Sequence, residues 1–565
     1  MISLDGLSIT LAFAAGISFF LYGMHVMSVG LQKAAGSKMK KLLEALTRTK
    51  LLGVLVGAGV TGIIQSSTAT TVMVVGFVNA GIMNLNQSVG IIMGANIGTT
   101  VTSWLIASSE WAKYLNPIFL APLFVLTGVI LVIFVKNQTA KNIGEIFAGF
   151  GILLIGMEGM TEAMGPLSTS PILKDMIVML GSNPILGILA GALVTCIIQS
   201  SSASVGILQS LAAVSLMPIN SAVFIIMGQN IGTCITAIIS SIGTSKNAKS
   251  AAYIHLIFNM IGSVIFSVGA IIFFNFINTD IGMETITLTQ ISIFHTSFNV
   301  INTAVLFPFS NQIIKLATFI NSRSKTVASE NDLVHLDERI LKSPGFAIEN
   351  CFKEIVRMAK ITFENLRTAV QCATTRSITD VEAVYTREAT INMFARDISQ
   401  YLVKLCNQEL SEGESKDITS FFNIINDIER VGDHSENMAE LAEYSVSENL
   451  QFSETALAEL NDITALTIRC FEHSMNALET NDKEMARLVV TEEDQIDVLE
   501  KQLRAGHILR LKNNECSPEI GVVFLDLITN LERISDHALN IAQVVLNERG
   551  AIKIHDINKN LKGEI

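Results

Sequence analysis

The sequence predicts an all-α protein in which a polytopic membrane domain of two inverted repeats precedes a soluble helical bundle. Half of the 565 residues are hydrophobic, which is too large a share for a single soluble domain. Charge divides the chain, because residues 1–320 carry 13 Lys and Arg and 9 Asp and Glu, whereas residues 321–565 carry 26 and 42. The first part also resembles itself at an offset of 134 positions. The acidic second part disfavours nucleic acid and anionic lipid as its partners.

Nine apolar stretches lie within the first 320 residues. A helix needs about 20 residues to cross the hydrocarbon of a bilayer, so most of the stretches are expected to be ordinary spans. The first has no basic residue ahead of it and is too long for a signal-peptide core, so we expect it to be retained. The stretches are 7–31, 51–80, 86–107, 117–136, 143–164, 183–212, 220–242, 250–275 and 288–312.

A polar motif interrupts two of these stretches at matching positions. Over residues 53–102 against 187–236, 24 of 50 positions are identical. Two hydrophobic units that are each broken by polar residues indicate a secondary transporter with its binding site between the repeats. The alternative is that the hydroxyls bond back to their own helix or to a neighbouring one. The two copies of the motif are Gln65, Ser66, Ser67, Thr68 and Gln199, Ser200, Ser201, Ser202.

Basic residues favour one topology, because Lys and Arg collect in cytoplasmic loops. If both interrupted stretches are re-entrant hairpins, the loops at 32–50, 136–143 and 243–250 share one side and hold most of the basic residues. If both stretches cross once, the loop at 136–143, with Lys136 and Lys141, lies on the outside instead. Hairpins are therefore favoured, and the repeats at about 7–136 and 143–275 become inverted, with their hairpin tips near the midplane. The span at 288–312 is additional.

Both motif copies resemble the paired signature of the type II sodium-phosphate cotransporter family in its bacterial form, over about residues 7–315. The resemblance implies that inorganic phosphate is the substrate and that sodium is the coupling ion. It places the phosphate on the eight residues of the two motif copies. Hydroxyl and backbone N–H donors suit an anion in a region that has no Lys or Arg near either motif. The sodium ligands are then expected behind the motifs, at Asn96, Thr99, Asn230 and Thr233.

Residues 340–550 show long amphipathic helical patterns with only two prolines, which indicates a helical bundle. A motif recurs in it at an offset of 103, and each copy places a Glu and an Asp four residues apart on one helix face. This motif resembles that of PhoU, a helical regulator of phosphate uptake, and implies a metal site for Mg²⁺, Mn²⁺ or iron. The alternative is a solvated face bridged by arginine. The predicted ligands are Glu429, Asp433, Glu532 and Asp536.

The second metal motif has Asn530 where the first copy has Asp427. Two identical sites are therefore not expected. The seven cysteines are scattered without a Cys-x-x-Cys pair, which disfavours a zinc knuckle or a disulfide framework and fits a reduced cytosolic domain.

We therefore expect a membrane domain at 1–320, a linker at 321–339, a PhoU-like regulatory domain at 340–550 and a tail at 551–565. The predicted function is sodium-dependent phosphate symport by alternating access, in a multi-pass protein of the bacterial plasma or inner membrane with a cytoplasmic C-terminal domain. It is not an enzyme. The alternatives are a phosphate exporter of the same fold and a non-transporting phosphate sensor. Expected partners are phosphate, sodium and the lipid bilayer, and a homo-oligomer stays open.

Overall fold

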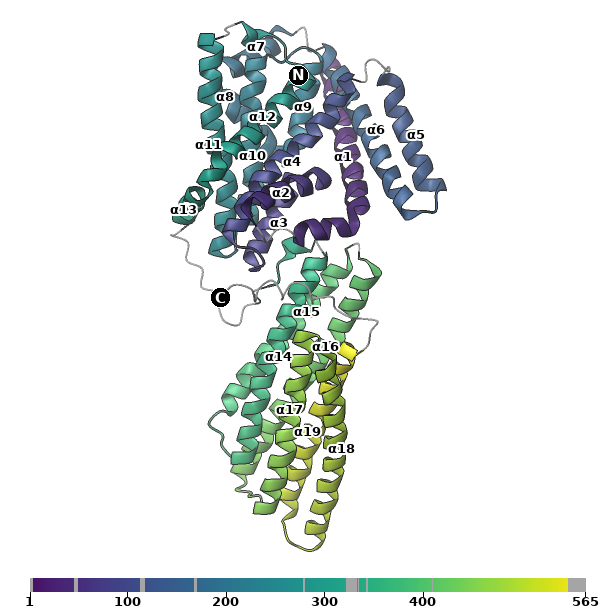
Figure 1. Cartoon of the computed structure of the whole chain (residues 1–565), viewed down its shortest axis with the longest axis vertical. Coiled ribbons are helices and arrows are strands. Elements are labelled where there is room, and N and C mark those ends of the chain that lie inside the picture. Colours follow the sequence, from purple (N-terminus) through teal and green to yellow (C-terminus); the bar gives the residue numbers. More distant parts are fainter. Residues whose placement is uncertain are drawn as a thin grey trace. The chain divides into compact units, whose positions relative to one another are not determined.

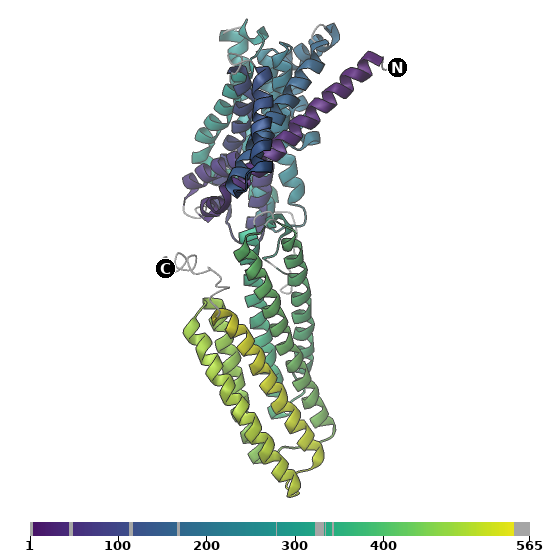
Figure 2. The same cartoon turned by 90° about the vertical axis from the view of Figure 1, so that its right-hand side faces the viewer.

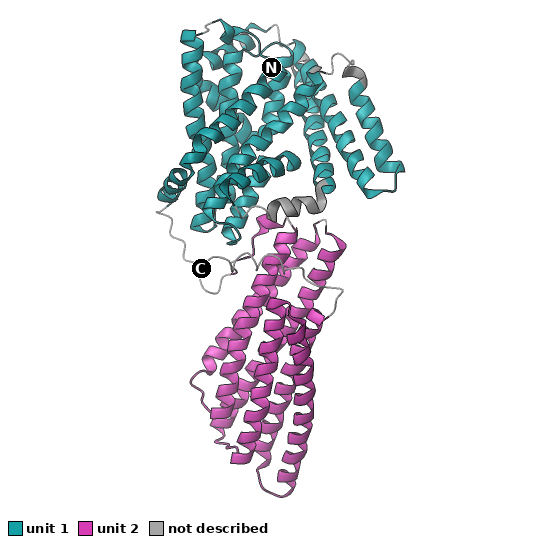
Figure 3. Ribbon diagram, viewed as in Figure 1, with its two compact units in different colours: residues 1–327 teal, residues 328–565 magenta. Residues whose placement is uncertain are grey.

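The computed structural model is helical almost throughout, and no strand lies within the residues that it describes (Figure 1). The chain forms two compact units, Met1–Val327 and Ala328–Ile565 (Figure 3). The tail expected at 551–565 and most of the linker lie outside the described residues. The described ranges are 4–44, 49–111, 117–166, 170–277, 280–321, 333, 335–341, 344–408 and 410–546.

The first unit contains the predicted membrane helices. Six of its described helices are long and apolar enough to cross a bilayer, or seven if the bent pair α7 and α8 counts as one span. The helices are α1 Leu4–Glu44, α2 Lys50–Ile64, α3 Ser67–Asn79, α4 Leu85–Trp111, α5 Pro117–Phe134, α6 Gln138–Met164, α7 Pro171–Ser182, α8 Pro184–Ile198, α9 Ser201–Ala213, α10 Ile219–Ser240, α11 Lys246–Ile272, α12 Leu288–Leu306 and α13 Ser310–Ile320.

Each interrupted stretch folds as two short helices, as the polar motifs predict. The pair α2 and α3 has 15 and 13 residues, and the pair α8 and α9 has the same two lengths. At 1.5 Å per residue each half is about 20 Å long, which is less than the roughly 30 Å hydrocarbon core. Neither half can span a bilayer alone. Re-entry from opposite sides, and with it the inversion of the repeats, stays a prediction.

The two repeats use the same helix crossing. A Cβ atom on Gly94 of α4 would collide with the carbonyl oxygen of Val54 on α2, and a Cβ on Gly228 of α10 would collide with that of Ile188 on α8. Only glycine permits backbones to approach this closely. All four positions are related by the 134-residue offset, so the structure repeats the geometry as well as the sequence.

A second crossing joins α1 to α6, and Figure 2 shows α1 running obliquely across the first unit. Gly23 of α1 and Gly149 of α6 face each other, and a Cβ on either would meet the backbone of the other helix. On the same face Phe20 is buried and packs against Gly206 of α9. This apolar contact holds α1 and α6 beside the second interrupted stretch.

The described residues of the second unit form a bundle with six long helices that run side by side (Figure 1). The first three pack together, the last three pack together, and α16 and α19 join the two halves. Their apolar faces form a core that includes Phe394, Phe421, Phe471 and Phe524, all of which are fully buried. The helices are α14 Pro344–Thr375, α15 Val381–Cys406, α16 Glu412–Ser447, α17 Glu454–Thr480, α18 Lys483–Lys512 and α19 Pro518–Leu546.

Candidate functional sites

The backbone breaks at the glutamine of each motif copy. Gln65 ends α2 and Gln199 ends α8, and both residues adopt the left-handed conformation with φ 57° and ψ 24°. A residue with a Cβ occupies this region uncommonly. Its occurrence at two matching positions in the middle of apolar stretches marks both breaks as candidate functional positions.

The serine after each glutamine begins the next helix. The Ser66 Oγ accepts a hydrogen bond from the Ala69 N–H at 3.1 Å, and the Ser200 Oγ accepts one from the Ala203 N–H at 3.2 Å. Both serines are therefore N-caps. The N–H groups in the first turn of a helix have no partner within the helix, and the positive end of the helix dipole lies there. In α3 and α9 this turn holds the predicted substrate residues that follow the caps.

One hydroxyl group brings the two motif copies together. The Thr102 Oγ1 of α4 donates to the Gln65 Oε1 at 2.7 Å and lies 3.1 Å from the Ser202 Oγ of α9. Gln65 and Ser202 come from opposite repeats, so the starts of α3 and α9 converge on one place in the first unit.

Thr102 is absent from the residues predicted by the motifs. A signal for it was present, because Thr102 is the last identical position of the repeat and matches Thr236. Of the predicted residues, Gln65, Ser67, Ser201 and Ser202 are buried, Ser66, Thr68 and Ser200 are partly exposed, and Gln199 is exposed.

The predicted sodium ligands lie buried on α4 and α10, and each donates one hydrogen bond to its own helix. The Asn96 Nδ2 donates to the Ile92 carbonyl at 2.8 Å, and the Asn230 Nδ2 donates to the Ile226 carbonyl at 2.9 Å. Thr99 and Thr233 likewise donate to carbonyls one turn back in their own helices, at 2.9 and 3.0 Å. The side-chain oxygens keep lone pairs that can accept, and such oxygens are the ligands that hard cations prefer.

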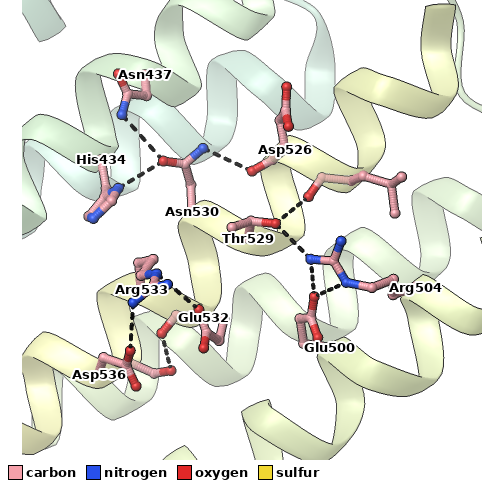
Figure 4. Close-up of polar contacts among 12 residues, drawn as sticks. His434, Asn437, Glu500, Arg504, Asp526, Thr529, Asn530, Glu532, Arg533 and Asp536 are labelled. Carbon is pink, nitrogen blue, oxygen red and sulfur yellow. Dashed lines mark hydrogen bonds and ion pairs between the residues drawn. The ribbon is translucent and has the colours of Figure 1, made fainter.

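The bundle motifs meet across α16 and α19. The His434 Nδ1 lies 2.8 Å from the Asn530 Oδ1, and the His537 Nδ1 lies 2.9 Å from the Asp427 Oδ1. Asn437 also donates to the Asn530 Oδ1, at 3.4 Å (Figure 4). Each motif therefore hydrogen-bonds to the other, and the position that holds Asp427 in one copy and Asn530 in the other supplies the acceptor oxygen in both contacts.

The predicted metal ligands are bridged by arginine in both copies. The Arg533 guanidinium lies 3.6 Å from a carboxylate oxygen of Glu532 and 3.6 Å from one of Asp536 (Figure 4). Arg430 lies 3.0 Å from Asp433 in the same way. Among the described residues no group of three or more His, Cys, Asp and Glu side chains is close enough to hold a metal ion. A metal would require these carboxylates to turn away from arginine, and the metal site stays a prediction.

A buried glutamate that the motifs do not include lies beside Glu429, Asp433 and Glu436 of α16, which we call the first acidic face. Glu388 of α15 is 2% exposed, and both of its carboxylate oxygens lack a hydrogen-bond partner among the described residues. A Cβ on Gly432 would lie 2.5 Å from its Oε2. Burial, with the like charges of Asp433, Glu436 and Glu429, raises the pKa of Glu388 to about 8. An unsatisfied carboxylate beside the predicted ligands fits a divalent cation.

Glu532 and Asp536 of α19 form the second acidic face, and Glu493 of α18 adds a further carboxylate to it. Burial raises the pKa of Glu493, and the charges of Asp497 and Asp536 raise it further. Burial also raises the pKa of Glu532, with Asp536 as the next cause. Glu493 and Asp497 repeat the four-residue spacing of the recognised motif, which is the signal that could have identified them.

Comparison with known protein families and relatives agrees with this division of the chain. Residues 19–162 and 166–292 match the family described as Na+/Pi-cotransporter, and residues 355–442 and 460–545 match the PhoU domain. The chain is 31% identical over 315 residues to the uncharacterised protein YqeW of Bacillus subtilis, covering 54% of this chain and 97% of the relative.

Two further relatives cover the bundle. The chain is 23% identical over 538 residues to the Escherichia coli protein named "Putative inorganic phosphate export protein YjbB", covering 94% of this chain and 97% of the relative. It is 26% identical over 196 residues to a Thermotoga maritima phosphate-specific transport system accessory protein, PhoU homolog 1, covering 34% of this chain and 83% of that protein. The bundle alone thus corresponds to most of a separate protein.

Proposed function

Since the chain belongs to the Na+/Pi-cotransporter family and carries a PhoU domain, we propose that it moves inorganic phosphate together with sodium by alternating access. The phosphate lies where the first turns of α3 and α9 meet. The observation that carries this proposal is the contact of Thr102 with Gln65 and Ser202, because it joins the two motif copies into one polar centre. The chain is a multi-pass membrane transporter, and no catalytic step is part of the proposal.

The chemistry of this centre suits an anion that arrives with a cation. Residues 51–112 and 175–245 contain no Lys or Arg. A phosphate ion is then compensated by helix N-termini, by hydroxyl donors and by cations that bind with it. Ser67 and Ser201 are the buried hydroxyls closest in sequence to the two N-caps, and they are our leading phosphate donors.

Asn96, Thr99, Asn230 and Thr233 hold the sodium in this proposal. Each donates to its own helix, so its side-chain oxygen is oriented by a hydrogen bond and is available to a cation. Without sodium the anion would be poorly compensated in a region of low dielectric, which is the physical reason for coupling.

Net export is the second candidate, and the name of the Escherichia coli relative favours it. The same site serves both directions, because the direction of net flux depends on the gradients. In either case we propose that the bundle lies in the cytoplasm and regulates transport, with a divalent cation on its acidic faces. A sensor that does not transport has no need of two matched breaks.

The test is uptake of labelled phosphate into proteoliposomes with an inward sodium or potassium gradient. Ser67→Ala and Ser201→Ala each remove one donor with little change in volume. A hydrogen bond to a charged group is worth about 1.5–3 kcal/mol, so the apparent affinity for phosphate should fall about 10- to 150-fold in each variant. Ser18→Ala is the matched control, since among the described residues the Ser18 Oγ bonds only to the Ala14 carbonyl of its own helix. If both variants keep the wild-type affinity, phosphate binds elsewhere. If uptake is equal with a potassium gradient, sodium is not the coupling ion.

A further inference from the structure

The two breaks share one backbone conformation but differ in the side-chain bonds around them. At the first break the Thr61 Oγ1 of α2 donates to the Thr70 Oγ1 of α3 at 3.0 Å, and Thr102 donates to Gln65 at 2.7 Å. Both bonds are buried, and Gln65 is 5% exposed. The Gln65 amide also donates to the Gly62 carbonyl. The first break is therefore closed by bonds that tie α2, α3 and α4 together.

The matching bonds are missing at the second break. Thr195 and Ser204 stand where the first repeat has Thr61 and Thr70, and both hydroxyls are buried without a partner among the described residues. The side chain of Gln199 is exposed, and neither it nor Thr236 makes a side-chain hydrogen bond within the described part of the chain. An exposed amide in an apolar stretch is stable only where water reaches it. The side chain at the second break is therefore exposed and without a hydrogen-bond partner among the described residues, in contrast to the buried and bonded Gln65.

The sequence nevertheless supplies every group needed for the mirror-image closure. Thr236 lies 134 residues after Thr102, and Gln199 lies 134 residues after Gln65. Thr68, the counterpart of Ser202, carries a hydroxyl and is only partly buried. Buried hydroxyls without a partner are unfavourable, so Thr195 and Ser204 gain when they pair with each other. The chain thus holds two equivalent sets of groups and satisfies one of them.

We propose that Thr102 and Thr236 are positioning residues for alternating access, and that each closes one break in turn. Thr102 closes the first break onto Ser202 while the second break is open to water. When the second break closes, Thr236 bonds to Gln199 and Thr68, and Thr102 releases Gln65. This inference rests on the proposed transport function, but it concerns the two states of the protein rather than the ligand.

The test uses two reporter thiols at matching positions. Cys196 is partly exposed near the second break, and Gly62 occupies the matching position in the first repeat, where a Cβ would have ordinary contacts. One full-length protein keeps Cys196, and another carries Gly62→Cys with Cys196→Ser. Both carry Cys406→Ser and Cys516→Ser, because the remaining four native cysteines are buried. The rate of reaction with a water-soluble maleimide is measured in liposomes without phosphate or sodium.

We expect the Cys196 thiol to react faster than the thiol at position 62. Thr102→Val should raise the rate at position 62 and lower it at Cys196, and Thr236→Val should do the opposite. One net hydrogen bond corresponds to a change of about 2- to 12-fold in the balance of the two states. Thr102→Ser and Thr236→Ser keep the hydroxyl and should restore the wild-type pattern, which general loss of packing would not do.

Two results would overturn the inference. If Cys196 reacts no faster than position 62, its exposure is to lipid and the second break is not open to water. If both valine variants shift both reporters in the same direction, the threonines act only on stability. Labelling does not require phosphate, so these outcomes are independent of the transport assay. Opposed shifts together with normal phosphate affinity in the Ser67→Ala and Ser201→Ala variants would leave the inference intact and remove the proposed site.

Discussion

The His537 Nδ1 of α19 lies 2.9 Å from the Asp427 Oδ1 of α16, and this contact ties the two halves of the bundle together. Its counterpart is the contact between His434 and Asn530. The Asp427 carboxylate and the Asn530 amide therefore each supply an oxygen to a histidine of the opposite motif. Asn540 also donates to the Asp427 Oδ1 at 3.1 Å. The acceptor oxygen, rather than the charge, is the common feature.

Loss of this acceptor should weaken the bundle. Asp427→Ala removes the acceptor of the partly buried His537 and of the exposed Asn540, which should lower the free energy of unfolding by about 0.5–1.5 kcal/mol for each hydrogen bond lost. Asp427→Asn should recover most of this loss, because Asn530 already serves in the other half. Thermal unfolding of the bundle 340–550 measures both, since about 1 kcal/mol shifts the midpoint by about 2–4 °C at this size. A loss in Asp427→Asn as large as in Asp427→Ala would show that the charge itself is required.

Glu388 should make the stability of the bundle fall as pH rises. Its pKa is raised from the ordinary 4.5 to about 8, so between these values the folded bundle holds a proton that the unfolded chain has released. The stabilisation is complete below about pH 4.5 and is lost as pH rises through about 8. Glu388→Gln mimics the protonated form, so without added metal the variant should be more stable than wild type at pH 8–9 and similar to it near pH 4.5. A variant that is less stable at pH 9 would contradict this.

The acidic faces should bind a divalent cation through the motif aspartates. Asp433→Asn combined with Asp536→Asn removes one charge from each face, and Mn²⁺ binding to the bundle should weaken at least about tenfold. Isothermal titration measures the affinity directly and does not depend on transport. Glu364→Gln is the control, because within the described part of the chain this exposed α14 carboxylate pairs only with Arg367. An unchanged titration curve would leave the acidic faces as solvated surfaces bridged by Arg430 and Arg533.

Replacing Asn96 or Asn230 should weaken the apparent affinity for sodium more than the apparent affinity for phosphate. Replacing either with Ala removes one oxygen ligand, and the sodium concentration for half-maximal uptake should rise several-fold while the phosphate affinity at saturating sodium changes little. Proteoliposome uptake at varied sodium and fixed phosphate gives the first quantity, and the reverse series gives the second. If the phosphate affinity falls while the sodium dependence stays constant, these amides bind phosphate rather than sodium.

The proposed orientation predicts which loops face the cytoplasm. A cysteine placed at Lys136, in the connection between α5 and α6, should react with an impermeant thiol reagent only after cells are opened. A cysteine at Ser170, which starts α7 without a side-chain cap, should react in intact cells. The opposite pattern would remove the hairpin assignment, the inversion of the repeats and the cytoplasmic bundle together.

Local sequence determined where the helices of the membrane unit break. Gln65 and Gln199 each stop a helix and the following serine caps the next one, and these bonds reach no more than four residues along the chain. The division into two units and the duplicated motifs are also visible in the sequence, because composition and repeats do not depend on packing. The four predicted sodium ligands, Asn96, Thr99, Asn230 and Thr233, rest on the family resemblance and stay a prediction.

Only the tertiary structure decided which of these groups meet. Thr102 is 37 residues from Gln65 and 100 residues from Ser202, and Glu388 reaches the acidic face from another helix. The repeats are nearly equal in sequence at the breaks, yet the described side-chain bonds at the first break have no counterpart at the second. In this structure one of two equivalent sets of hydroxyls is hydrogen-bonded, while Thr195 and Ser204 of the other set lack a partner among the described residues. The sequence contains both sets equally, whereas the folded structure forms the hydrogen bonds of one set.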